Sequence, residues 1–95
     1  MGRTQIIWDL EDDPEGNVQH IAEHGLTREE VEEVLLGPER LGTSRSTGQP
    51  TAFGRTSTGR YIVVVYEEIA RDILRPVTAY DVPAPRSTKG KRRKR

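Results

Sequence analysis

The sequence has no cysteine, only five aromatic residues and no long apolar run. The absence of cysteine excludes disulfide frameworks and thiolate zinc sites. The longest apolar run, Tyr61–Tyr66, is far shorter than the roughly 20 residues that a membrane-spanning helix needs. The first residues also lack the apolar stretch of a secretory signal. We therefore expect a soluble protein of the cytoplasm.

Apolar side chains are scarce as well, at 33% of 95 residues, which leaves room for one small core. A core of this size gives marginal stability, so a partner is expected, either a second copy of the chain or another protein. The same length excludes large metabolic architectures that pair a cofactor domain with a substrate domain.

Net charge is also lacking, but the formal charge of zero hides a strong partition along the chain. Residues 1–39 contain two arginines and eleven acidic residues, a net charge of −9. Residues 40–83 contain six arginines and four acidic residues, and the last twelve residues add seven cations and no acid. The acidic part repels nucleic acid, whereas the middle and the tail attract it.

The first third of the chain predicts one short strand and two helices. The β-rich segment 5–9 predicts the strand, and helical spacing of apolar residues predicts a helix over 15–24, with Pro14 near its start and Gly25 at its end. Thr27 and Glu30 form a capping-box pattern before an apolar stripe, which predicts a second helix over 27–36.

After Gly37 the apolar pattern becomes strand-like and is interrupted by turn-forming residues. We predict an antiparallel meander with strands near 40–46, 51–57, 60–67 and 73–80. The run Tyr61–Tyr66 is apolar on both faces, so it should be a central strand with helices on at least one side. Pro76 lacks a backbone donor and predicts an edge or a bulge.

The predicted fold class is therefore α+β: a short strand, two helices and a meander of about four strands. Residues 1–83 should form the single domain. Residues 84–95 contain no apolar residue that anchors a core, and we expect them to be a disordered basic tail.

Two arginines, Arg55 and Arg60, flank a Gly-rich turn that also offers hydroxyls and backbone amides. Converging guanidinium groups bind phosphate oxygens well, so the turn is a candidate phosphate clamp, which Arg45 and Arg75 would join if their strands are adjacent. The alternative is an ordinary hairpin with arginines that keep it soluble.

His20 and His24 lie one helical turn apart, a spacing that suits either a metal site or a single acid–base imidazole. The glutamate of a zinc protease motif is missing, so no metal is expected and a solvated histidine is the main alternative. His24 is the better acid–base candidate because it ends its helix. Glu67 is a weaker one, since paired carboxylates at strand ends are commonly solvated.

The tail is a candidate nucleic-acid arm through cations that include Lys91, Arg92 and Arg93. Its alternative partner is the acidic half of the same protein. The chain has no phosphate-binding loop, dinucleotide fingerprint or nucleophile elbow, so no cofactor is expected.

Taken together, several segments resemble the BrnT-like toxins over about residues 6–81. These segments are Trp8-Asp9, His24-Gly25, the capped helix 27–36 with Pro38, the turn 54–60, the strand Tyr61–Glu67, and Arg75 with Val77–Ala79. Two positions differ from the family pattern: Glu23 replaces a basic residue, and Tyr80 replaces an arginine. The segment between Trp8 and His24 is also longer, and the basic tail stands in place of a C-terminal helix.

The resemblance implies a RelE-like fold and a toxin of a type II toxin–antitoxin system. Such a toxin is a metal-independent endoribonuclease that blocks translation and is neutralised by a bound antitoxin protein. By position, the implied catalytic residues are His24, Arg55, Arg60 and Glu67. We expect Arg45, Arg75, Tyr80 and the cations of the tail to contact the RNA.

Two other classes of function remain open from the sequence. One is a non-catalytic module that binds RNA or the ribosome with the same fold. The other is a protein-interaction domain whose acidic half docks a basic partner.

Overall fold

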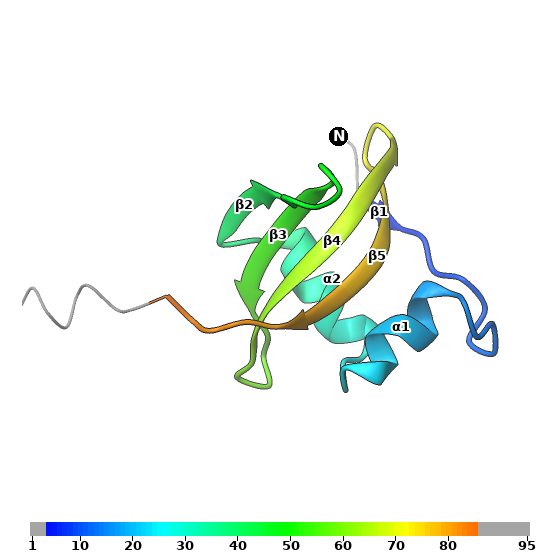
Figure 1. Ribbon diagram of the computed structural model, residues 1–95, viewed down its shortest axis with the longest axis horizontal. Coiled ribbons are helices and arrows are strands. Elements are labelled where there is room, and N and C mark those ends of the chain that lie inside the picture. The colour runs from blue at the N-terminus through cyan, green and yellow to red at the C-terminus, as the bar shows by residue number, and fades with distance from the viewer. Residues whose placement is uncertain (1–3, 86–95) are drawn as a thin grey trace, which may run out of the picture.

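A five-stranded mixed sheet carries the fold, with the strand order β1-β5-β4-β3-β2 (Figure 1). The computed structural model describes residues 4–85. The strands are β1 Gln5–Ile6, β2 Arg40–Thr43, β3 Pro50–Arg55, β4 Tyr61–Ala70 and β5 Ile73–Asp81. β1 is parallel to β5, and the other neighbours are antiparallel. The α+β prediction and the antiparallel meander are confirmed.

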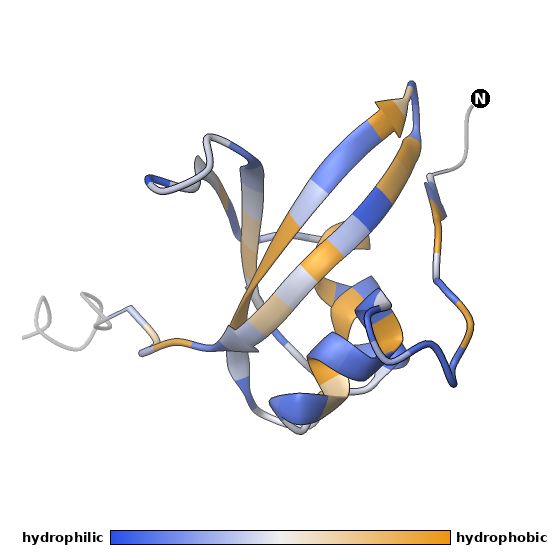
Figure 2. Ribbon diagram, turned by 45° about the vertical axis from the view of Figure 1, so that its right-hand side comes forward, coloured by the Kyte–Doolittle hydropathy of each residue, from blue (hydrophilic) through white to orange (hydrophobic). Residues whose placement is uncertain are grey.

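Two helices, α1 (Asn17–Glu23) and α2 (Arg28–Leu36), lie on one side of the sheet (Figures 1 and 2). α1 packs on β5, and α2 packs on β3 and β4. The core lies between helices and sheet, where Ile21, Val31 and Val34 meet Ile62 and Val64, all nearly inaccessible to solvent. The other face of the sheet carries no helix in the described chain.

α2 forms as its sequence predicts. The backbone N–H of Glu30 donates to Thr27 Oγ1 at 3.2 Å, and the N–H of Thr27 donates to Glu30 Oε1 at 3.0 Å. These reciprocal bonds satisfy two N–H groups that no helical carbonyl can reach. Gly37 then ends the helix.

α1 begins at Asn17, two residues later than predicted, and Pro14 lies in the preceding turns instead of at the helix start. The start is fixed by a tertiary contact: the N–H of Asn17 donates to Asp9 Oδ2, and the N–H of Asp9 donates to Asn17 Oδ1. Only glycine fits at the N-cap, Gly16, because an added Cβ would lie 2.8 Å from Asp9 Cβ. The helix ends at Glu23, close to the predicted end, and Gly25 follows with φ of 73°, a conformation that favours glycine.

The strands follow the predicted places with different ends. β1 has two residues because the chain leaves the sheet towards α1 after Ile7, whose N–H still donates to Leu74 O. β2 stops at Thr43, where the β2–β3 loop begins. The register of β4 on β5 shifts beside Pro76, so the predicted bulge is confirmed.

The predicted tail, residues 84–95, lies outside the described residues except for Ala84 and Pro85. These two are exposed and have no regular structure. Within residues 4–85, no helix has the length and apolar character that crossing a membrane requires.

Candidate functional site

The helix-free face of the sheet, here called the open face, is hollowed. Strand alternation directs Tyr61, Val63 and Val65 of β4 to this face, because Ile62 and Val64 between them enter the core. The residues opposite these three on the neighbouring strands lie on the same face. Arg55 is opposite Tyr61, Phe53 and Tyr80 are opposite Val63, and Thr51 is opposite Val65. The hollow has a volume of about 660 Å³.

Apolar side chains form the floor of the hollow, and polar ones form its rim. Val63, Val65 and Val82 line the floor, with Phe53 and Tyr80 beside them. The rim comes from β2 and the β2–β3 loop, which contribute Arg40, Thr43, Ser44, Arg45 and Ser46. None of the described residues that line the hollow is acidic.

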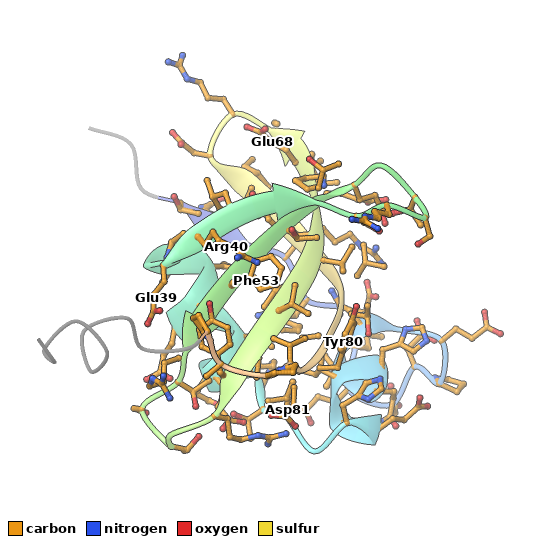
Figure 3. All side chains as sticks on the ribbon, turned by 60° about the vertical axis from the view of Figure 1, so that its left-hand side comes forward. Glu39, Arg40, Phe53, Glu68, Tyr80 and Asp81 are labelled. Carbon is orange, nitrogen blue, oxygen red and sulfur yellow. The ribbon has the colours of Figure 1, made fainter. Side chains whose placement is uncertain are left out.

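Two arginines on the open face lie against aromatic rings. The Arg40 guanidinium carbon is 4.3 Å from the centre of the Phe53 ring, and that of Arg55 is 5.6 Å from the centre of the Tyr61 ring. Figure 3 shows Arg40 and Phe53 side by side, with Tyr80 further along on β5. A guanidinium held over a ring keeps its edge N–H groups available for a phosphate, and its own plane can stack on a base.

Arg60, which the sequence pairs with Arg55, points to the helix side instead. Its Nε and Nη2 donate to the two Asp81 carboxylate oxygens at 2.9 and 2.6 Å. The remaining bonds go to the carbonyl oxygens of Gly25 and His24 after α1. Arg55 and Arg60 therefore lie on opposite faces of the sheet, and the predicted phosphate clamp does not form. Arg60 instead ties α1 to the end of β5.

The turn between β3 and β4 is also occupied by acidic partners from α2. Thr58 Oγ1 donates to Glu30 Oε2 and lies 2.7 Å from Thr56 Oγ1, while the N–H of Ser57 donates to Glu33 Oε1 at 2.8 Å. The Thr58 hydroxyl and the Ser57 amide that the sequence offers to a phosphate are thus used by carboxylates. The turn is a structural joint between sheet and helix.

Glu30 is the centre of that joint and is 93% buried, with 7% of its surface exposed. Burial alone raises the pKa of Glu30, but hydrogen bonds from Thr58 and Thr27 and the charge of Arg60 outweigh it. The pKa therefore lies below the ordinary value of 4.5. Because folding lowers this pKa, the ionised carboxylate stabilises the fold above about pH 4.5. That contribution disappears as the pH falls from there through the folded-state pKa.

Glu30→Gln is accordingly expected to lower the free energy of unfolding by about 2 kcal/mol at pH 7, since hydrogen bonds to a charged acceptor are lost. The difference from wild type should shrink below pH 4.5. Urea unfolding at pH 7 and pH 3 measures both. Glu29→Gln, at the exposed neighbouring position, is the control and should show little change at either pH. A pH-independent deficit in Glu30→Gln would contradict the role of the charge.

His24 and Tyr80 are in contact at the edge of the open face that β5 forms. Their ring centres are 5.9 Å apart with a tilt of 50°. β1 pairs with only two residues of β5, so within the described chain no strand lies beyond Tyr80, which is 40% exposed. Asp81 is adjacent, and its pKa is lowered by the hydrogen bond from Arg60 and by the charges of Arg60 and His24, which outweigh its desolvation.

Glu67 lies at the opposite end of the sheet from this corner. Its carboxylate accepts a hydrogen bond from Gln49 Nε2 at 3.3 Å and lies 3.9 Å from Arg75 Nη1. Tyr61, opposite Arg55, is six residues from Glu67 on β4, or about 20 Å at roughly 3.3 Å per residue. Glu67 therefore does not share a site with Arg55 or His24.

Arg75, a predicted RNA contact, is engaged too, because its Nη2 lies 2.8 Å from Asp9 Oδ2. Of the arginines predicted as site residues, Arg45 and Arg55 are on the open face, and Arg60 and Arg75 are in ion pairs. Lys91, Arg92 and Arg93 lie outside the described residues. Among residues 4–85, no three His, Asp or Glu side chains gather in a way that would hold a metal ion.

Sequence reasoning missed Arg40, Phe53 and Tyr61 as members of the face. Phe53 is two residues before Arg55 on β3, so the two side chains lie on the same face of the sheet. Arg40 of β2 lies opposite Phe53, and Tyr61 of β4 lies opposite Arg55, so both share that face. A register assumed for the β2–β3 and β3–β4 hairpins would have placed these three residues on the open face, because residues opposite each other share a face.

Comparison of the chain with protein-family models, with curated proteins and with solved structures gave no match.

Proposed function

We propose that the chain is a BrnT-like toxin of RelE-like fold, which binds single-stranded RNA on the open face and cleaves it without a metal ion. One observation carries the proposal: the open face combines arginines stacked on aromatic rings with a hollow that no described acidic residue lines. Arginines bind the phosphates, and aromatic and guanidinium planes stack with unpaired bases.

Charge supports this side of the molecule as the RNA side. The helix layer carries Glu29, Glu32 and Glu33 on α2, in the half of the chain with eleven acidic residues and two arginines. Phosphates are repelled by that layer and attracted to Arg40, Arg45 and Arg55. An RNA strand is therefore directed to one face. As the resemblance implies, such a toxin is neutralised by a bound antitoxin protein, and we propose the cytoplasm as its location.

Cleavage is assigned to the corner that His24 and Tyr80 form. His24 takes the proton of the ribose 2′-hydroxyl, and the 2′-oxygen attacks the adjacent phosphorus. The bond from phosphorus to the 5′-oxygen breaks, and Tyr80 donates the proton that this leaving oxygen needs. The products are a 2′,3′-cyclic phosphate and a 5′-hydroxyl. Arg40 and Arg45, which line the same hollow as Tyr80, bind neighbouring phosphates and hold the strand across the open face.

Purified wild-type protein should cut single-stranded RNA in the presence of EDTA, leaving 2′,3′-cyclic phosphate ends. His24→Ala and Tyr80→Phe are each expected to lower the cleavage rate about 10²-fold, the contribution of one positioned acid or base. His20→Ala, one turn earlier on α1 and exposed, is the matched control and should cut at the wild-type rate. Binding of uncleavable 2′-O-methyl RNA should be unchanged in all three variants.

A non-catalytic RNA-binding module is the second candidate. It is favoured by the separation of Glu67 from the corner and by the engagement of Arg60 with Asp81. The same experiment decides between the two: RNA that binds but stays intact selects the module. Cleavage that His24→Ala leaves unchanged would remove the corner from the mechanism.

A further inference from the structure

We infer that the hollow of the open face holds one unpaired nucleotide of the RNA, with the base on the valine floor and its phosphate at Arg45. This inference rests on the proposed function and specifies what the site recognises. The ligand of the hollow then has two parts: a flat ring that is largely apolar, and an anionic phosphate.

The floor suits a base. Val63 and Val65 are only 3% and 8% exposed, yet both line the hollow, so they lie at its bottom. Phe53 and Tyr80 stand beside them. Apolar and aromatic surfaces of this kind gain free energy when a flat ring covers them. The Arg40 guanidinium, held over Phe53, adds a cationic plane on which a base can stack.

The rim suits a phosphate. Arg45 is exposed in the β2–β3 loop and makes no ion pair within residues 4–85. Ser44 and Ser46 flank it in the sequence, and their hydroxyls are hydrogen-bonded to each other at 3.3 Å. The Arg45 guanidinium and the one hydroxyl proton that this bond leaves free offer several donors to phosphate oxygens. No acidic side chain among the described lining residues competes for them.

The size is also consistent with one nucleotide and its neighbouring phosphate. The volume of about 660 Å³ falls within the range of about 300–1,000 Å³ that is usual for small-molecule sites. A base reaches the valine floor only when it is unpaired, because a paired base presents its edge to the other strand. The hollow thus selects single strands.

NMR titration of the full chain tests this assignment with adenosine 5′-monophosphate as the probe. We expect it to shift the backbone amide signals of residues 42–46, 63 and 65. Adenosine, which lacks the phosphate, and ribose 5-phosphate, which lacks the base, should each bind at least about 10-fold more weakly. Arg45→Glu should weaken binding of the monophosphate about 10-fold. Arg71→Glu, the same change at the exposed β4–β5 turn, should leave it unchanged.

Binding of a 2′-O-methyl RNA dodecamer separates this inference from the proposed function. A dodecamer that binds wild type and Arg45→Glu equally, while the monophosphate shifts no amide of the hollow, overturns the nucleotide site and leaves the RNA-binding face standing. Ribose 5-phosphate binding as tightly as the monophosphate also overturns it, because the base is then not held. Monophosphate binding in the hollow without dodecamer binding supports the site and overturns the proposed function.

Discussion

Replacing Asn17 with alanine is expected to lower the free energy of unfolding by about 3 kcal/mol. Asn17 is 2% exposed. Its Nδ2 donates to Ile7 O at 3.1 Å and to Pro76 O at 2.9 Å, while its Oδ1 accepts from the N–H of Asp9 at 2.8 Å. Alanine leaves these three backbone groups without their partner, at about 1 kcal/mol each.

Urea unfolding followed by circular dichroism measures the loss. Gln19→Ala is the matched control, because Gln19 lies on the same helix and donates its amide to Glu11 O in an exposed position. It should cost less than about 0.5 kcal/mol. Equal losses in the two variants would mean that the Asn17 bonds add nothing beyond ordinary surface contacts. In a small domain of about 5–15 kcal/mol total stability, a loss of 3 is easily resolved.

The contrast between α2 and α1 explains which parts of the fold were predictable from sequence. The signals for α2 are local: Thr27, Glu30 and Gly37 each act within one turn of the helix that they define. The start of α1 depends on Asp9, eight residues earlier, and on the carbonyl of Pro76, 59 residues later. No local pattern in the sequence contains that information.

The candidate site was predicted less well because its arrangement depends on register. Arg55 and Arg60 are near each other in sequence, and the turn between them suggests convergence. Arg55 ends β3 with its side chain on the open face. Arg60 precedes β4, and its side chain lies on the helix side of the sheet, where it binds Asp81 and the residues after α1. A change of one residue in the turn would reverse that parity. Tyr80 lines the hollow, and its contact with RNA stays a prediction.

The acidic and the arginine-bearing parts of the sequence lie on different sides of the fold. The acidic half supplies both helices, which cover one face of the sheet. The arginine-bearing half supplies β2–β5, which build the other. Two of its arginines, Arg60 and Arg75, then pair with Asp81 and Asp9 at the junction of sheet and helices. Arg40, Arg45 and Arg55 on the open face make no ion pair within residues 4–85, so they are available to an anionic partner.

Simultaneous charge reversal of Arg40, Arg45 and Arg55 to glutamate is expected to weaken binding of single-stranded RNA about 10³-fold. Each arginine loses a charge-assisted bond to phosphate, which contributes about 1.5 kcal/mol or more. The salt dependence should change in parallel. Three phosphate contacts on a single strand contribute about −2 to the slope of log K against log salt concentration, and the variant should lose that share.

Fluorescence anisotropy with a labelled 2′-O-methyl dodecamer, measured over a series of salt concentrations, gives both quantities. Arg28→Glu with Arg71→Glu is the control, because these exposed or half-exposed arginines lie on α2 and at the β4–β5 turn, away from the hollow. A chain ending at Pro85 isolates the tail, whose seven cations would contribute about −5 to the slope if all contacted phosphates. If the triple variant kept the wild-type slope and only the shortened chain lost affinity, the tail would be the RNA-binding element. The open face would then have to recognise something other than RNA.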